Sequence, residues 1–380
     1  MENGKLRIVH CFRSPVGGIF RHVRDLIEAH SSDCHELGIV CDSSTGGAYE
    51  ERLFDEIRPQ LALGLIRFPM RRAIAPSDLS AIWRTYGALK ELKPDIIHAH
   101  GAKGGAYARI IGSLLRVSGT RVARLYCPHG GSVHYDGSAL SGRLYFGLER
   151  ALERMTDRLI FVSRYEMDGY SEKVGIPRCP VTQVYNGLRP GEFEPVSPAP
   201  DAADFLYIGM MRDLKGTDLF IEALAILASE GIRVSAHLVG DGPDKPRYAA
   251  MIDELNLTSQ VTIHDAMPAR KAFALARIVV VPSRAESMPY IVLEAIAANR
   301  PVICTRVGGI PEIFAGEAEA LVEPGSASAL AEAMKSALRD ADLEQTATRR
   351  REMVQNRFSV ERMADDIMEA YRATLDNSVK

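Results

Sequence analysis

The stretch that decides the fold reads IVVVPSRAESMPYIVLEAIAANRPVICTRVGGIPE, residues 278–312. It opens with four β-branched apolar residues, 278–281, which are typical of a buried parallel strand. A polar loop leads to Pro289, which suits the start of a helix because that position needs no N–H. The helix is expected to end at Asn299 in a left-handed turn, before Pro301. A second strand and a glycine loop follow, so the order predicts a parallel α/β sheet with both loops at the carboxyl ends of its strands.

Two glutamates lie in the first loop and its helix. Glu286 precedes the helix, and Glu294 lies about one and a half turns inside it. Such a pair can hold two sets of hydroxyl groups, for example those of a sugar and of a ribose. The N–H groups of Tyr290 and Ile291, at the start of the helix, would point at an anion. The pattern therefore predicts a site for a sugar attached to a diphosphate, whereas the two glutamates alone would also fit a solvated helix face.

The spacing of Glu286 and Glu294, inside the frame 281–311, resembles the motif of the family-four glycosyltransferases of the GT-B superfamily, the group 1 glycosyl transferases. The resemblance implies two Rossmann-like, doubly wound parallel-sheet domains that face a cleft. It implies a retaining transfer from a nucleoside diphosphate sugar, with no covalent enzyme intermediate, no cofactor and no protein-bound metal. Met288 and Pro289 are expected to contact the donor, although many members have glycine in place of Pro289, which removes one N–H donor.

Arg212 and Lys215 are the second pair expected to carry chemistry. They follow an expected strand that ends at Gly209, and Gly216 comes next. A diphosphate leaving group gains negative charge as the glycosidic bond breaks, and these cations would stabilise it. Two exposed cations after a strand are the alternative interpretation. The context resembles the family's arginine–lysine–glycine motif, although a spacing of three is shorter than is common. Gly209 and Gly240, each at the end of an expected strand, are expected to contact the donor.

The first half of the chain also alternates expected strands and helices. Gly17 and Gly18 follow the first strand, and no third glycine completes a dinucleotide fingerprint. A tight turn and a ligand contact both fit this pair, and the resemblance implies close approach to donor and acceptor. His129, before a Gly-Gly turn, matches the family's histidine near the transferred sugar. Asn186 ends the last strand of this half, as the family's asparagine–glycine turn does, and is placed on the acceptor side.

His98 and His100 alternate on one face of an expected strand, which is the spacing of a pair of metal ligands. No third ligand is apparent near them in the sequence, so we expect a structural role or, for His100, a place on the acceptor side. The six cysteines form no C-x-x-C pair. Buried free thiols in a reducing compartment are therefore expected, and no metal site.

Length and composition favour two globular domains. The chain has 380 residues, of which 46% are hydrophobic and 25% charged. We expect an acceptor-side domain at 1–195, a proline-rich linker at 196–202 and a donor domain at 203–358. The resemblance implies that 359–380 form a helix that packs back on the first domain. No apolar stretch is long enough to span a membrane and no signal peptide is seen, so a cytoplasmic protein is expected.

Charge is distributed unevenly between the two halves. Residues 1–195 hold 26 basic and 22 acidic side chains, a balance of +4, and the remainder holds 20 and 27, a balance of −7. A basic surface with apolar neighbours can dock on the inner face of an anionic cytoplasmic membrane, although a solvated basic surface fits equally. The pI of 6.4 and the lack of a dense basic stripe in the sequence argue against nucleic acid as a partner. The arginines are Arg67, Arg71, Arg72 and Arg84, beside Phe68, Ile74, Ile82 and Trp83.

These observations predict a retaining glycosyltransferase that transfers a sugar to a hydroxyl group of a glycan or a lipid-linked acceptor in cell-surface polysaccharide synthesis. One alternative is a sugar-nucleotide epimerase of the same fold, which would need catalytic carboxylates in the first domain, where no motif for them is seen. The other is a non-catalytic sugar-nucleotide-binding protein. Such a protein would be expected to lack Arg212, Lys215 or Glu286, and all three are present.

Overall fold

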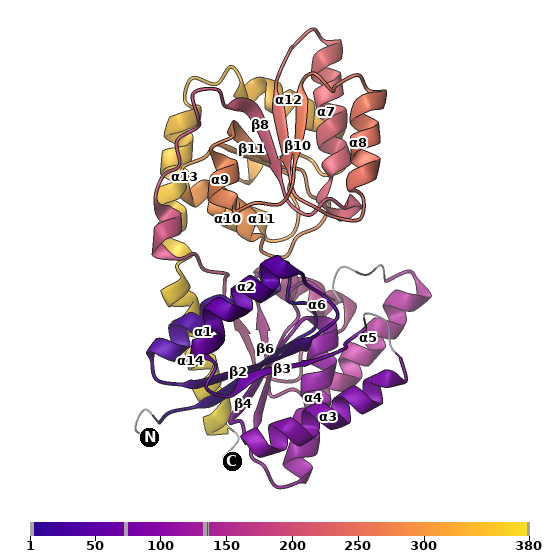
Figure 1. The fold of residues 1–380 in the computed structure, drawn as a ribbon, viewed down its shortest axis with the longest axis vertical. Helices are drawn as coiled ribbons and strands as arrows, with labels where there is room; N and C mark the ends of the chain where they lie inside the picture. The colour runs from indigo at the N-terminus through magenta and orange to yellow at the C-terminus, as the bar shows by residue number, and fades with distance from the viewer. Residues whose placement is uncertain (1–3, 72–74, 132–134, 136, 378–380) are drawn as a thin grey trace. The chain divides into compact units, whose positions relative to one another are not determined.

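A computed structural model describes residues 4–71, 75–131, 135 and 137–377. The chain divides into two compact units (Figure 1). The first contains residues 1–187 and 360–380, and the second contains residues 188–359. Arg72 and Ile74 of the expected basic surface lie outside the described residues. Among the residues that are described, no helix combines the length and the apolar character needed to cross a bilayer.

The first unit contains a sheet of seven parallel strands in the order β3-β2-β1-β4-β5-β6-β7. The chain builds outward from β1 to β3 and then returns to pair β4 with β1. This reversal makes a topological switch point between β1 and β4, the usual place for a ligand in such sheets. The strands are β1 (Arg7–Phe12), β2 (Glu36–Asp42), β3 (Gly64–Phe68), β4 (Ile96–His100), β5 (Ala123–Cys127), β6 (Arg158–Phe161) and β7 (Val181–Gln183).

Helices cover both faces of this sheet (Figure 1). Alternate residues of β1 and β4 point to opposite faces, so Val9 and Cys11 join the core cluster under α3 and α4, whereas His10 lies on the face of α1 and α14. The last helix, α14, packs against α1 and β5. The helical elements are α1 (Gly17–Ser32), α2 (Ala48–Ile57), α3 (Ser77–Leu92), α4 (Gly101–Val117), α5 (Leu140–Leu152), α6 (Arg164–Lys173), α14 (Val360–Asn377) and the 3-10 turns η1 (Arg58–Gln60) and η2 (Glu153–Met155).

The second unit contains five parallel strands in the order β10-β9-β8-β11-β12, so its switch point lies between β8 and β11. The strands are β8 (Ala203–Ile208), β9 (Ala236–Val239), β10 (Val261–His264), β11 (Ala276–Val281) and β12 (Val302–Cys304). The helices are α7 (Thr217–Ser229), α8 (Lys245–Glu254), α9 (Ala269–Phe273), α10 (Tyr290–Ala297), α11 (Ile310–Phe314), α12 (Ala327–Ala337) and α13 (Leu343–Arg357), with 3-10 turns η3 (Pro190–Phe193), η4 (Asp213–Lys215) and η5 (Ala318–Ala320).

The predicted doubly wound parallel sheets are confirmed in both units. The stretch 278–312 forms β11, α10, β12 and the start of α11 in the expected order. Asn299 takes the left-handed conformation expected after the helix, with φ of 57°. Pro289 is the N-cap of α10, one position earlier than predicted.

The first unit ends at residue 187, not at the predicted boundary of 195. The amide of Leu188 donates to the carbonyl of Phe358 at 2.8 Å, and the guanidinium of Arg270 donates to the carbonyl of Glu194 at 2.8 Å. The amide of Val196 donates to the carbonyl of Ala298 at 2.9 Å. Residues 188–202, including the predicted linker, are therefore tied by hydrogen bonds to the second unit.

Candidate active site

Lys215 and Glu286 meet at the switch point of the second unit. Lys215 ends η4, the element that follows β8 in the chain, and Glu286 lies in the loop after the neighbouring strand β11. The Nζ of Lys215 lies 2.6 Å from Oε1 of Glu286, whose side chain is only 9% exposed. The hydroxyl of Ser283 donates to the same oxygen at 2.7 Å. The topology thus brings two predicted catalytic residues, 71 positions apart, into one ion pair at the carboxyl edge of the sheet.

Two glycines allow the loops around this ion pair to approach closely. Gly216 has φ of +67°, and a side chain there would run into the carbonyl of Pro282. Gly308 has φ of +59°, and a side chain there would overlap the carbonyl of Glu286 itself. Both positions combine a left-handed backbone with backbone contact, which only glycine accommodates without a shift. The position of the Glu286 carboxylate therefore depends on glycines in the loops after β8 and β12.

Arg212 provides a cation beside the ion pair. It lies at the N-cap of η4 and is half-buried. Its side chain makes no hydrogen bond or ion pair with any residue that the structure describes, so its guanidinium is available to an anion. Gly209 and Gly240, which are also expected to contact the sugar donor, lie against each other at the ends of β8 and β9.

The loop after β11 is fixed by an arginine that sequence reasoning missed. Arg284 donates through Nη1 and Nη2 to the two carboxylate oxygens of Asp218, at 2.8 and 2.7 Å. Asp218 lies in the first turn of α7, so this bidentate pair joins the loop that carries Glu286 to the helix that follows Lys215. Ser283 was also missed. Neither residue belongs to a motif, and only the pairing of β8 with β11 reveals their contacts.

The other predicted donor residues lie along α10. Met288, Pro289 and Tyr290 are buried at its start, and Ile291 is half-buried. Glu294 is half-buried in the second turn of the helix. The structure thus places Glu286 in the loop before the helix and Glu294 within it, in the order that the sequence predicted.

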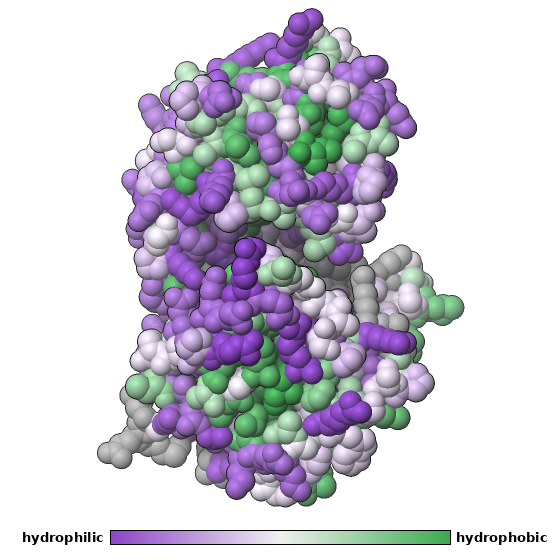
Figure 2. Space-filling model, in the orientation of Figure 1, coloured by the Kyte–Doolittle hydropathy of each residue, from purple (hydrophilic) through white to green (hydrophobic). Residues whose placement is uncertain are grey.

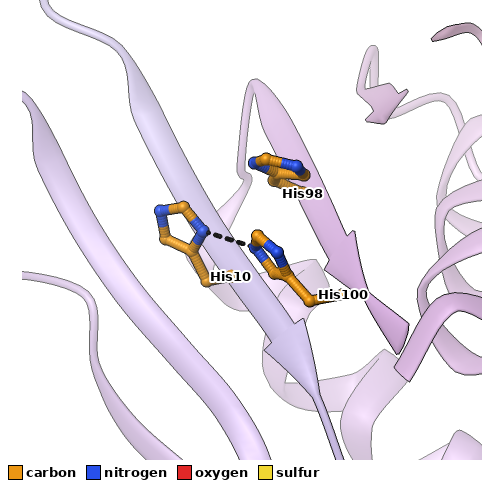
Figure 3. Close-up of side chains that lie close together, drawn as sticks. All are labelled: His10, His98 and His100. Atoms are coloured by element: carbon orange, nitrogen blue, oxygen red, sulfur yellow. Dashed lines mark hydrogen bonds between the residues drawn. The ribbon is translucent and has the colours of Figure 1, made fainter. Parts of the chain in front are cut away.

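The first unit gathers histidines at its own switch point (Figure 3). His10 of β1 is paired in register with His98 of β4, and Nδ1 of His10 lies 3.0 Å from Nε2 of His100. Ring nitrogens of the three residues lie within 4.8 Å of one another. The prediction that no third possible ligand lies near His98 and His100 is therefore wrong. His10 was missed because strand pairing, not sequence proximity, places it there.

The predicted residues His100, His129 and Asn186 belong to this histidine cluster. Nδ1 of His100 lies 3.0 Å from Nε2 of His129, so a chain of ring contacts runs from His10 to His129. Nδ1 of His22, on α1, lies 3.2 Å from Oδ1 of Asn186. Buried rings in such a chain are held neutral, because burial lowers the pKa of His10, His100 and His129 well below the ordinary value. The half-buried His129 is therefore a neutral imidazole that can accept from or donate to a hydroxyl group.

Gly17 and Gly18 lie at the start of α1, directly after the loop that follows β1. Both are exposed, and Gly17 has φ of +67° with open space where a side chain would be. This loop follows the first strand of the switch point, so the pair borders the edge of the sheet near which His100 ends β4. The structure therefore fits either a turn or a ligand contact for these glycines, as the sequence did.

Arg67 does not contribute free charge to the expected basic surface. Its guanidinium pairs with Glu51, donates to the carbonyl of Asp42 at 3.2 Å and lies 5.0 Å from the ring centroid of Phe54. Arg71 and Arg84 are exposed. The basic surface is therefore weaker on β3 than the sequence predicted.

Comparison with solved structures identifies the fold. The structure of Alr3699/HepE from Anabaena, solved in complex with UDP and glucose, superposes with a TM-score of 0.77. It shares 17% sequence identity and covers 96% of this chain and 99% of its own. The fold, with its two doubly wound parallel sheets, is GT-B, as predicted.

Family models match both units. Residues 16–192 match Glycosyltransferase Family 4, and residues 202–340 match Glycosyl transferases group 1. EpsD of Bacillus subtilis, a glycosyltransferase by name, is 26% identical over 330 residues, which cover 82% of this chain and 85% of EpsD. TuaC of the same organism, named for teichuronic acid biosynthesis, is 37% identical over 129 residues, 34% of this chain and 31% of TuaC. The chain belongs to the group 1 glycosyltransferases of family four and is a glycosyltransferase.

The two glutamates are expected to differ in role. Glu294→Ala should weaken binding of the bare nucleoside diphosphate, because this residue lies within α10. Glu286→Ala should mainly lower turnover, because its carboxylate pairs with Lys215 at the edge of the sheet. Calorimetric affinities and turnover of both variants test the assignment, with Glu222→Ala, an exposed carboxylate on α7, as control. Equal losses of affinity in both variants would refute it.

The histidine cluster should make the chain less stable in mild acid. Burial lowers the pKa of His22 from 6.5 to about 4. Below pH 6.5 the unfolded chain then binds a proton that the folded chain does not, so stability falls as the pH drops from 6.5 towards 4. For His22 alone the loss between pH 7 and pH 5 is about 2 kcal/mol. Denaturant titrations at both pH values should show a smaller loss in His22→Gln than in the wild type. The same loss in both would contradict the assignment.

Proposed function

We propose that the protein is a retaining glycosyltransferase that moves a sugar from a nucleoside diphosphate sugar to a hydroxyl group of a glycan or lipid-linked acceptor. The observation that carries the proposal is the contact of Lys215 with Glu286 at the switch point of the second sheet. Arg212 also follows strand β8. It adds a second cation, which has no partner among the described residues. Together they form a site with cations for a diphosphate and a carboxylate for sugar hydroxyls.

The chemistry follows from these groups. As the bond between the anomeric carbon and the diphosphate oxygen breaks, charge grows on the diphosphate, and Arg212 and Lys215 stabilise it. The acceptor hydroxyl forms its new bond to the anomeric carbon on the face that the diphosphate leaves, and its proton passes to a diphosphate oxygen. The configuration is thereby retained without a nucleophile from the protein. The Glu286 carboxylate, held by Lys215 and Ser283, suits a role in holding sugar hydroxyls.

The class of substrate is supported by similar proteins. HepE was solved with UDP and glucose, and TuaC is named for the synthesis of a cell-surface polymer. We therefore infer a role in polysaccharide synthesis, with the protein in the cytoplasm and peripherally bound at the inner face of the membrane. An epimerase and a non-catalytic binding protein are not favoured, because the family matches are to glycosyltransferases and the residues expected for transfer are present.

Transfer itself should need no metal ion, because two cationic side chains occupy the edge where the diphosphate would bind. We expect extensive dialysis against EDTA to leave turnover unchanged. The measurement is nucleoside diphosphate release before and after dialysis, with divalent cations then added back. A loss of turnover that Mg²⁺ or Zn²⁺ restores would contradict the proposal. It would direct attention to His10, His98 and His100, whose ring nitrogens lie close together.

Removing either cation should lower turnover and leave the fold intact. Lys215→Ala and Arg212→Ala should each reduce the rate by roughly a hundredfold or more, because a preorganised charge facing the leaving group is lost. Release of nucleoside diphosphate from a panel of nucleotide sugars measures the effect, and product analysis separates transfer from epimerisation. Lys271→Ala, an exposed lysine on α9, is the control. Wild-type rates in one variant would remove that residue from the mechanism.

A further inference from the structure

The first unit contains a pocket of about 800 Å³ that the proposed transfer does not by itself explain. One end lies at the switch point, where His100, Gly101 and Arg13 line it. From there it extends between the helices on the opposite face from the histidine cluster. Its walls there are mainly apolar and come from Ile82 of α3, Ala102, Ala106, Tyr107 and Ile110 of α4, and Tyr145, Leu148 and Leu152 of α5.

The cation of this pocket that has no partner among the described residues lies at one end of it. Arg13, in the loop after β1, is half-buried, and its guanidinium forms no hydrogen bond or ion pair with any described residue. Asp78, also in the lining, is already paired with Lys103 and accepts from the hydroxyl of Tyr107 at 2.6 Å. The buried Glu149 accepts from Arg109 at 2.8 Å. The available charge in the lining is thus the cation at the switch-point end, and the carboxylates are neutralised by partners.

The apolar wall continues onto the surface of α5. Leu140, Leu144 and Leu148 follow one another at intervals of four residues, which places them along one stripe of the helix. Their exposed fractions fall from 84% to 66% and 38% as the stripe approaches the pocket that Leu148 lines. Hydrophobic side chains are seen at the surface of the first unit in Figure 2, at the edge where Figure 1 places α5. On α3, Leu79 and Trp83 are also exposed.

We propose that this pocket binds the hydrocarbon anchor of a membrane-borne acceptor with an anionic phosphate headgroup. The inference rests on the proposed function and names the class of acceptor. The phosphate would lie at Arg13, because that cation lacks a partner among the described residues. The hydrocarbon would lie between α4 and α5, where burial of apolar surface stabilises it. The leucine stripe would contact the bilayer from which the lipid enters, since exposed apolar patches of this kind mark membrane or partner surfaces.

This arrangement places the reacting end of the acceptor at the histidine cluster. His100 both lines the pocket and contacts His129 in the chain of rings. A headgroup at Arg13 would therefore lie at the same edge of the sheet as the neutral imidazoles, with its hydrocarbon directed away from them. A sugar carried on that headgroup is then held at the carboxyl edge of the first sheet, as a phosphate-linked acceptor requires.

The test uses the full chain and dodecyl phosphate below its micelle concentration. Trp83 is the one tryptophan in the sequence, and it lies on α3 beside the lining residue Ile82. Because Trp83 is 62% exposed and does not itself line the pocket, binding is measured by isothermal titration calorimetry. Dodecyl phosphate should bind saturably. Inorganic phosphate, which lacks the hydrocarbon chain, and dodecanol, which lacks the phosphate, should each bind at least about tenfold more weakly. Arg13→Gln should weaken dodecyl phosphate and leave dodecanol unchanged.

A matched pair of substitutions on α4 locates the ligand. Ile110→Asp places a charge in the apolar wall and should abolish binding, whereas Val117→Asp, on the same helix but 88% exposed and outside the pocket lining, should not. Far-UV circular dichroism and thermal unfolding, measured in parallel, show that each variant is folded. Ala106→Trp, which fills the pocket without adding charge, gives a second variant. Equal binding by wild type, Ile110→Asp and Ala106→Trp would overturn the inference.

Sedimentation with vesicles tests whether the leucine stripe of α5 contacts the bilayer. The wild type should sediment with vesicles that contain anionic phospholipid, and a Leu140→Ser/Leu144→Ser variant should remain in the supernatant, whereas Ile176→Ser, an exposed apolar residue elsewhere, should still sediment. If sugar transfer is observed but dodecyl phosphate does not bind, the lipid inference fails and a soluble glycan acceptor stands. If no nucleotide sugar is turned over although dodecyl phosphate binds, the proposed function fails instead.

Discussion

Both candidate sites described above depend on one constraint, the reversal of strand order in a parallel sheet. All strands of such a sheet end at the same edge, and only at the reversal do two adjacent loops depart in opposite directions. In the second unit this separates the loops after β8 and β11, and Lys215 and Glu286 meet there at 2.6 Å. Gly216 and Gly308 permit that approach, because their left-handed backbones face carbonyl groups where any side chain would collide.

The same constraint has a cost in the first unit. The reversal between β1 and β4 brings His10 and His98 into register in the interior, and Nε2 of each has no hydrogen-bond partner among the described residues. A buried polar atom without a partner costs on the order of 1–3 kcal/mol. The rings are tolerated because burial lowers their pKa values and they remain uncharged. A cluster of neutral imidazoles beside the switch point of the first unit is therefore maintained at the expense of stability.

Local patterns predicted the parts of the fold that are local. The run 278–281, Pro289 and Asn299 specified β11, α10 and the left-handed residue after it, because each acts through its own backbone. The sequence could not show that His10 lies beside His98, because that proximity arises from strand pairing. It also could not show that the first unit ends at residue 187, since that boundary depends on hydrogen bonds from distant residues. Sequence patterns supplied candidate residues for the site, whereas the contacts between those residues are seen only in the structure.

The location of usable charge illustrates the same limit and bears on the acceptor. Counting residues gave the first half an excess of +4 and drew attention to the arginines around β3. Contacts change that assignment, because Arg67 is paired with Glu51 whereas Arg13, which no pattern singled out, lines a pocket without a partner among the described residues. A paired cation attracts an anion far less than an unpaired one, so the proposed site for a phosphorylated lipid lies at Arg13 and the neighbouring helices α3, α4 and α5. The exposed leucines of α5 lie on that same side, and charge and apolar surface therefore converge on one pocket.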